Sequence, residues 1–202
     1  MRISSLRCFI LVATLSFATC RCHAQQPTLG STKAASLPKI AGITTVFRKN
    51  SHAEVIIGRL IRGYSLNNEG PRPALILTSL FTDQVPKSDL SRAWGTQYGF
   101  PIVGSVNEAL THSSKTLNVD GVLLVAEHGD YAKSATGNKQ FPKRRLFGEV
   151  ARAFEKSGRS VPVFSDKHLA DNWDDAKWIY DRAKELKVPF MAGSSLPVLW
   201  RY

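Results

Sequence analysis

Residues 163–169 decide the fold, and they read Val163-Phe164-Ser165-Asp166-Lys167-His168-Leu169. The stretch begins as a short apolar run, which predicts a buried strand, and it stops abruptly on ionisable side chains. Residues 172–187 follow with the acids and aromatics of a helical segment. In an open α/β sheet, ligands bind in the crevice outside the carboxyl ends of the strands. A strand that ends on Asp-Lys-His therefore predicts a functional site.

The same alternation of apolar strand and helix runs along the chain. Local signals mark the helix starts, because Ser51 and Asn172 are good helix caps and Ser105 with Glu108 fits a capping box. Strands that alternate with helices, each a continuous apolar run, indicate a parallel sheet covered on both faces. The predicted fold class is α/β, a doubly wound, Rossmann-like and mostly parallel sheet. The other expected strands lie at residues 40–46, 74–80, 101–103, 119–126 and 189–192.

The first 24 residues have the pattern of a bacterial-type secretory signal peptide. Arg2 and Arg7 precede an apolar run, and Ala24 offers a small residue for cleavage. The alternative is an uncleaved anchor, for which the apolar run falls short of the roughly 20 residues of a membrane span. We expect a secreted or periplasmic protein with no stable membrane span once the signal is removed. Its expected parts are a signal peptide at 1–24, a flexible linker at 25–38, a Rossmann-like domain at 39–195, and a tail at 196–202 as the candidate start of a second domain.

Removal of the signal changes what the composition predicts. Cys8, Cys20 and Cys22 all lie within it, so the mature chain would have no disulfide and no cysteine nucleophile. The signal also holds three arginines and no acid, so its removal lowers the formal net charge from +11 to +8. A basic surface suits anionic ligands. Because the basic residues are scattered, we expect a small anionic or sugar-like ligand and no nucleic acid. We interpret the one basic run, residues 143–145, as a solvated helix start.

Several passages carry a likeness to a known family. They are Trp94-Gly95-Thr96-Gln97-Tyr98-Gly99-Phe100-Pro101, the strand at 119–126, Asp166-Lys167-His168-Leu169, and the closing strand at 189–193. Together they resemble the nucleotide-binding domain of the glucose–fructose oxidoreductase and inositol dehydrogenase (Gfo/Idh/MocA) family, over residues 39–193. The resemblance implies an oxidoreductase fold with NAD or NADP as cofactor, and it places Lys167 on the family's lysine.

The chain departs from that family at the phosphate-binding turn. A dinucleotide site normally has G-x-G-x-x-G there, so that bare backbone can approach the pyrophosphate. Residues 44–52 contain no glycine, and Phe47 and Arg48 stand in the turn instead. His168 replaces the proline that follows the family's lysine, and Glu127-His128 replaces a Thr-Pro pair. These departures argue against a bound dinucleotide.

Ionisable residues follow each main strand of the predicted sheet. The fourth and fifth long strands are adjacent in the resembled family, so their exits would face one another. This allows either acid–base chemistry around the lysine or a divalent metal site of histidines and carboxylates, although the spacing matches no known metal motif. After the first strand, a basic turn with a helix start would suit an anion. The catalytic candidates are Lys167, His128, Asp166 and His168, and the cofactor-binding candidates are Arg48, Ser51 and Asp83, with His52 beside them.

Three classes of function fit these observations. The first is an exported oxidoreductase of the resembled type. The second is an exported hydrolase or lyase that uses the His/Asp/Lys cluster, with or without a metal ion. The third is an exported ligand-binding domain without catalysis, because each histidine taken singly also fits ordinary hydrogen bonding at the start of a loop. The reaction and the substrate stay open at this stage.

Overall fold

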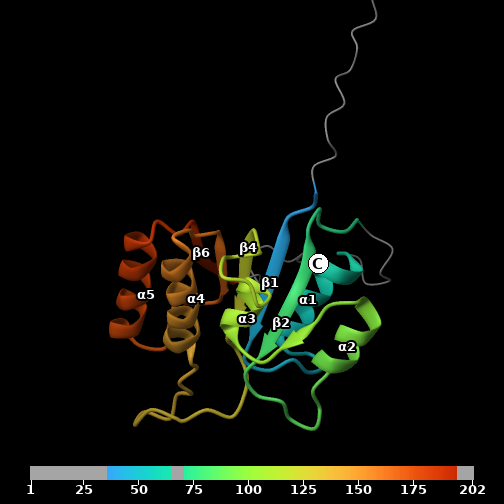
Figure 1. Cartoon of the computed structure of the whole chain (residues 1–202). Coiled ribbons are helices and arrows are strands. Elements are labelled where there is room, and N and C mark those ends of the chain that lie inside the picture. The colour runs from blue at the N-terminus through green and yellow to red at the C-terminus, as the bar shows by residue number, and fades with distance from the viewer. Residues whose placement is uncertain (1–35, 65–70, 195–202) are drawn as a thin grey trace, which may run out of the picture. The chain divides into compact units, whose positions relative to one another are not determined.

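The computed structural model describes residues 36–64 and 71–194. The predicted signal peptide, most of the predicted linker and the tail at 196–202 lie outside the described residues. In the described part, strands and helices alternate as the sequence predicts (Figure 1). The strands are β1 (Lys39–Thr44), β2 (Ile76–Thr82), β3 (Ile102–Val103), β4 (Gly121–Val125), β5 (Val163–Asp166) and β6 (Phe190–Gly193). The helices are α1 (His52–Arg62), α2 (Ser91–Tyr98), α3 (Val106–Thr111), α4 (Lys143–Ser157) and α5 (Trp173–Glu185).

The sheet is parallel throughout, with the strand order β3-β2-β1-β4-β5-β6. The chain first builds outward from β1 through β2 to β3, and then crosses back to place β4 on the other side of β1. The order therefore reverses between β1 and β4, which is the position where ligands bind in doubly wound sheets. This topology confirms the predicted Rossmann-like α/β fold.

Helices cover both faces of the sheet. On one face, α1 and α2 pack over a cluster that includes Phe47, Ile57 and Trp94. On the other, α3, α4 and α5 enclose a larger cluster that includes Phe147 and Phe154. Figure 1 shows α4 beside α5, with α1 and α2 grouped apart from them. Because both faces are buried, the strands read as apolar runs rather than as alternating patterns.

Local signals at the helix ends act as the sequence predicts. The side chain of Ser51 accepts a hydrogen bond from the backbone N–H of Glu54 at 3.2 Å, and Asn172 accepts one from Asp175 at 2.9 Å. Gly158 ends α4 in the left-handed conformation that favours glycine. These caps set where α1 and α5 begin, and therefore which side chains stand at the carboxyl edge of the sheet.

The carboxyl ends of β1, β4 and β5 lie next to one another because the three strands are parallel neighbours. The turn at 45–51 and the loops at 126–142 and 167–172 leave the sheet at this edge. Among the helices of residues 36–64 and 71–194, none is long and apolar enough to cross a membrane.

Candidate functional site

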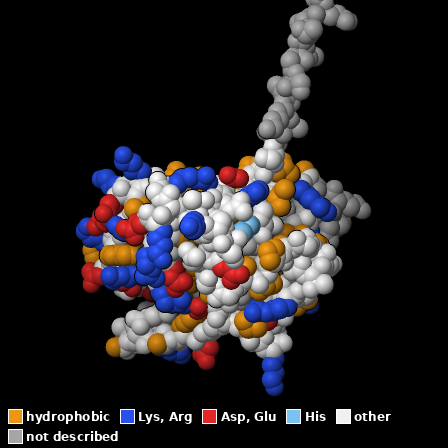
Figure 2. All heavy atoms as spheres, viewed as in Figure 1, with side chains coloured by type: hydrophobic (Ala, Val, Ile, Leu, Met, Phe, Trp, Pro, Cys, Tyr) orange, Lys and Arg blue, Asp and Glu red, His pale blue; other side chains and the backbone are white. Residues whose placement is uncertain are grey.

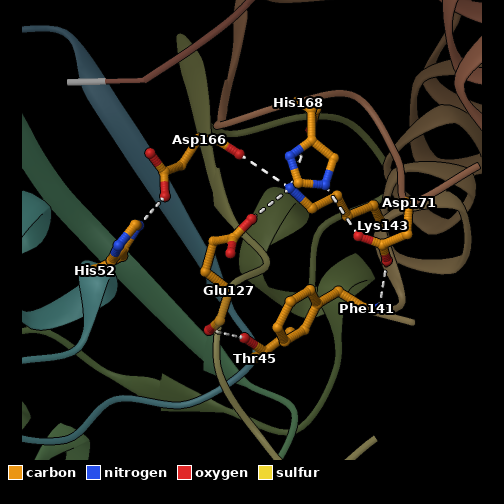
Figure 3. A network of polar contacts seen from close by, with 8 residues as sticks. All are labelled: Thr45, His52, Glu127, Phe141, Lys143, Asp166, His168 and Asp171. Carbon is orange, nitrogen blue, oxygen red and sulfur yellow. Dashed lines mark hydrogen bonds and ion pairs between the residues drawn. The ribbon is translucent and has the colours of Figure 1, made fainter. Parts of the chain in front are cut away.

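A hydrogen-bonded pair, His52 and Asp166, lies at the centre of the site (Figure 3). His52 is the first residue of α1 and Asp166 the last of β5, 114 positions further along. Nδ1 of His52 lies 2.6 Å from Oδ2 of Asp166. The aspartate is fully buried, whereas the histidine side chain is 32 % exposed. With the carboxylate as acceptor, Nδ1 of His52 donates the hydrogen of this bond.

His128, three positions beyond the end of β4, stands close to this pair. Its ring centroid lies 5.0 Å from that of His52, in an edge-to-face arrangement. Burial lowers the pKa of His128, and the nearby His52 and Arg48 lower it further. Desolvation penalises the charged imidazolium, so the ring is held in its neutral form near pH 7. The site thus combines one carboxylate-bound imidazole with one neutral imidazole.

Two buried polar atoms at this edge lack a protein partner within the described residues. They are Oδ1 of Asp166 and Nδ1 of His128. Most buried polar atoms in native proteins are hydrogen-bonded, and exceptions call for an explanation such as a catalytic role or a bound group. Both atoms lie close to the His52 ring, so each is available for a hydrogen bond to a ligand or to water at this edge.

The backbone is strained at the same edge. Asn50, His128 and Lys167 all have φ between 60° and 67°, in the left-handed region that residues other than glycine rarely occupy. Asn50 precedes the cap of α1, His128 follows β4, and Lys167 follows β5. The N–H of Lys167 donates to the carbonyl of Gly193 at 2.9 Å, which holds that turn against β6. Strain of this kind costs of order 1–3 kcal/mol per residue and concentrates at functional sites.

Lys143 corrects one interpretation of the sequence. The basic run at 143–145 is not a solvated helix start throughout, because Lys143 is fully buried. Its Nζ donates to Oε1 of Glu127 at 2.7 Å, to the carbonyl of Asp166 at 3.2 Å and to the carbonyl of His168 at 2.9 Å. An ammonium group has three donors, and here each finds an acceptor, which is what allows the charge to be buried.

This lysine ties the strand exits together (Figure 3). Glu127 follows β4, whereas Asp166 and His168 belong to the exit of β5, so a single Nζ bridges both. The hydroxyl of Thr45, just after β1, donates to the carbonyl of Glu127 at 2.6 Å. The ends of β1, β4 and β5 are therefore linked in one polar network, and Asp166 is held in place to meet His52.

The other catalytic candidates lie around this centre without all converging on it. Nε2 of His168 lies 2.9 Å from Oδ1 of Asp171, and the ring is 54 % exposed. In the described part of the chain His168 makes no contact with His52 or His128; its carbonyl is what reaches the network. Lys167 is half-buried at the strand exit. Asp166 thus pairs with His52 at the start of α1. The sequence suggests instead a partner at the exit of β4.

The α1 start, predicted to bind an anion, is satisfied by its own side chains. Ser51 is buried, and its hydroxyl accepts from the N–H of Arg48 and from that of Glu54, both at 3.2 Å. Glu54 in turn accepts from the N–H of Asn50 at 3.2 Å. This reciprocal capping places the Glu54 carboxylate in the first turn of α1. A phosphate group needs free N–H donors and positive charge at that position, so the α1 start is poorly suited to bind one.

Asp83, the acid that follows β2, is also engaged. Its Oδ2 accepts from the Tyr131 hydroxyl at 2.7 Å and from Nη2 of Arg145 at 2.6 Å. Burial raises the pKa of Tyr131, and the hydrogen bond to Asp83 raises it further. Gln84 adds two hydrogen bonds of 2.8 Å to the backbone of Asp130. These contacts fasten the loop at 126–142 to the end of β2.

These residues do not fit a dinucleotide of the NAD or NADP type. Such a cofactor needs a glycine turn and free N–H groups at the α1 start, and an acid after β2 that is free to bind ribose. Here the turn has the fully buried Phe47, the α1 start carries the Glu54 carboxylate, and Asp83 is bound to Tyr131 and Arg145. The side chain of His52 also reaches across to Asp166 at the strand-order reversal.

A resident metal ion finds no ready set of ligands either. Within residues 36–64 and 71–194, no group of three or more His, Cys, Asp or Glu side chains is placed to hold one. The histidines and carboxylates of the site are instead bonded in pairs, His52 with Asp166 and His168 with Asp171. Such pairs are suited to proton transfer.

Two residues at this centre, His52 and Lys143, are not among the catalytic candidates that the sequence predicts. His52 was visible as a polar group after the first strand, but nothing local indicated that it would meet Asp166. Lys143 had a weaker signal, since Pro142 places it in the first turn of α4. Its partner Glu127 lies 16 positions earlier, at the exit of β4, and no local pattern in the sequence links the two residues.

Comparison with known proteins finds similar chains among solved structures alone. The sequence matches no protein-family model and no curated protein. Among solved structures, apo scyllo-inositol dehydrogenase from Lactobacillus casei is 12 % identical, with a TM-score of 0.49, and the match covers 78 % of this chain and 36 % of that one. Biliverdin reductase from Synechocystis sp. PCC 6803, solved with biliverdin and NADP+, is 12 % identical with a TM-score of 0.48, over 80 % of this chain and 39 % of that one.

A probable dehydrogenase from Thermotoga maritima is 18 % identical with a TM-score of 0.47, and 77 % of this chain and 35 % of that one are covered. The chain therefore spans little more than a third of the length of these proteins. Sequence identity at this level gives no information on function. The strand order of the sheet establishes the Rossmann-like fold independently of these matches. At low identity, the chain is similar to part of each of these dehydrogenase and reductase structures.

Proposed function

We propose that the protein is an exported hydrolase or lyase that uses the His52–Asp166 pair for acid–base chemistry on a small anionic or sugar-like ligand. The observation that carries the proposal is the 2.6 Å contact between Nδ1 of His52 and Oδ2 of the buried Asp166. It lies at the carboxyl edge of the sheet, where α/β folds bind their ligands. The oxidoreductase alternative is less well supported, because the residues present do not fit the dinucleotide.

His52 has the properties of a general base in this arrangement. The buried carboxylate of Asp166 sets the tautomer and orientation of the ring, and it stabilises the imidazolium formed when Nε2 takes a proton. The partial exposure of the His52 side chain leaves the ring accessible to a ligand. A carboxylate-oriented histidine typically contributes 10²–10⁴-fold to a reaction rate.

His128 supplies a second proton-transfer group beside the first. Its lowered pKa keeps it neutral near pH 7, so it can accept or relay a proton without carrying a fixed charge. Arg48 and Lys167 stand at the exits of β1 and β5 and add positive charge to the edge, which favours an anionic ligand. The non-catalytic alternative assigns the same groups to binding alone, so the two readings differ only in turnover.

The test is a turnover assay in which the reporter is proton transfer itself. The purified protein is incubated in D₂O with small sugar acids and keto sugars, and ¹H NMR follows exchange or elimination at carbon. A parallel panel of chromogenic esters and glycosides tests hydrolysis. We expect turnover in one arm, reduced about 100-fold or more by His52→Gln, in line with the loss of an acid–base group.

The matched control is His112→Asn. His112 caps α3 in the left-handed conformation, which asparagine tolerates, and it lies outside the strand-exit network. Turnover that survives His52→Gln as well as it survives His112→Asn would refute the assignment of His52. Saturable ligand binding that depends on His52 but yields no turnover in any arm would favour the binding domain.

Export forms part of the proposal and has its own test. N-terminal sequencing of the protein recovered outside the cytoplasm should begin at Gln25, following cleavage after Ala24. Recovery of the intact Met1 chain from the cytoplasm would contradict it.

A further inference from the structure

A hollow lies between α4 and the first half of α5. It has a volume of about 450 Å³, and Arg144, Arg145, Gly148, Arg152 and Trp178 are among the residues that line it. None of these residues belongs to the His52–Asp166 pair or contacts it. The hollow therefore calls for an explanation independent of the function proposed above.

One wall of the hollow is an aromatic surface held in place. The Trp178 indole is half-buried and packs edge-to-face against Phe147 of α4, with ring centroids 6.5 Å apart. It also lies over Gly148, where a Cβ atom would come within 3.4 Å of the ring. Glycine inside a helix costs about 1 kcal/mol relative to alanine. At this position a Cβ atom would make an ordinary van der Waals contact with the indole, so the packing does not require glycine.

Three arginines and one acid, Asp175, are among the residues that line the hollow. Arg145, Gly148 and Arg152 fall on one stripe of α4, since residues three and four apart are neighbours on a helix surface. The first turn of α4 contains basic residues and no acid, although a helix start already carries positive partial charge. Figure 2 shows Lys and Arg side chains over α4 and α5, interspersed with Asp and Glu side chains.

Two of the three arginines are already paired, and the third is not. Arg144 stacks on the Trp178 ring at 4.9 Å and binds Asp175 at 2.7 Å, and that contact lowers the pKa of Asp175. Arg145 binds Asp83 and Glu149. Arg152 is exposed and has no hydrogen-bond or ion-pair partner among residues 36–64 and 71–194. The one acid that lines the hollow, Asp175, is thus balanced by Arg144.

We propose that this hollow binds a small organic anion, a carboxylate or phosphate group attached to a flat or apolar body. The planar guanidinium of Arg152 matches the two oxygens of such a group. The body of the ligand lies against the indole of Trp178, which has one face already covered by Arg144. Charge and apolar surface meet in one place, so each half of the ligand has a partner.

The test follows the indole N–H signal of Trp178 by NMR, assigned through its loss in Trp178→Phe. Sodium benzoate is the probe with both features, inorganic phosphate has only the charge, and benzyl alcohol has only the flat body. We expect saturable shifts with benzoate, weaker ones with phosphate and none with benzyl alcohol. Arg152→Met should weaken benzoate binding about tenfold or more, as expected for the loss of a charged hydrogen bond.

Lys156→Met is the matched control, because it removes one positive charge from the same helix at an exposed position outside the hollow. Its effect on benzoate binding should stay below twofold. Equal losses in the two variants would mean that the anion feels only diffuse charge, and they would overturn the proposal. The absence of a saturable benzoate shift in the unaltered protein would overturn it as well. The assay requires no turnover, so its outcome is independent of the fate of the His52 proposal.

Discussion

Replacement of Lys143 by methionine tests the network that holds the strand exits together. Methionine has a similar length and no charge, so it fills the space of the lysine stem while removing all three donors. Glu127 then loses its partner at 2.7 Å, and the carbonyls of Asp166 and His168 lose theirs at 3.2 and 2.9 Å. The bond to the Asp166 carbonyl is buried, and those to Glu127 and to the His168 carbonyl are part-buried.

The expected loss of stability is large. Breaking a buried ion pair by removing one partner costs about 3–5 kcal/mol, because the remaining charge is left uncompensated. The Glu127 side chain is only 12 % exposed, so hydration recovers little of this. Each unpaired buried carbonyl adds a cost of about 1–3 kcal/mol, which overlaps with the first term, and relief of the lysine's own desolvation opposes both. We expect a net loss of about 3–5 kcal/mol, against a total stability of about 5–15 kcal/mol for a typical domain.

The measurement is urea-induced unfolding of the full chain at pH 7, with the free energy of unfolding taken from the midpoint and slope. Lys177→Met is the matched control, because Lys177 forms an exposed pair with Asp181 within α5. That change should cost less than about 0.5 kcal/mol. In Lys143→Met/Glu127→Gln the unpaired charge is gone, so this double variant should regain about 1–2 kcal/mol relative to Lys143→Met alone.

The result that refutes this reasoning is a Lys143→Met loss of 1 kcal/mol or less with an unchanged slope. The lysine would then be no more important than an exposed one. A double variant that is less stable than Lys143→Met would also contradict the argument, because Glu127 would then have another role than pairing with this ammonium group.

Three further predictions concern the rest of the site. Because the pKa of His128 is lowered in the folded protein, the unfolded chain binds more protons below pH 6.5, so stability should fall as the pH drops from 6.5 through the folded pKa. His128→Asn should flatten that fall between pH 7.5 and 5.5 in urea unfolding, and an unchanged pH profile would count against the effect. Ser51→Ala should cost about 1 kcal/mol through loss of the α1 cap, whereas Ser88→Ala in an exposed loop should stay within about 0.5 kcal/mol, both measured by urea unfolding. Titration with NADH should leave tryptophan fluorescence without a saturable change, because Glu54 and Asp83 are already engaged; micromolar binding would show that the site does accept a dinucleotide.

Much of the fold could be read from the sequence because the signals that specify it are local. Helix caps such as Ser51 and Asn172 act on N–H groups three residues away, and the apolar runs of strands and helices repeat within one or two turns. Alternation of the two patterns then leaves few topologies, since parallel strands need crossover helices and connect with one handedness. The strand exits, and with them Asp166 and His128, were placed by this reasoning alone.

The composition of the site was decided by the tertiary structure. His52 meets Asp166 only because the strand order puts β1, β4 and β5 side by side, so residues 114 positions apart come within 2.6 Å. Lys143 looks like a surface residue in its own sequence context, and its burial depends on acceptors from two other segments. Local physics specifies which elements form and where each ends. Which side chains share a proton is settled by long-range packing, since a buried charge is tolerated only where the assembled fold brings it partners.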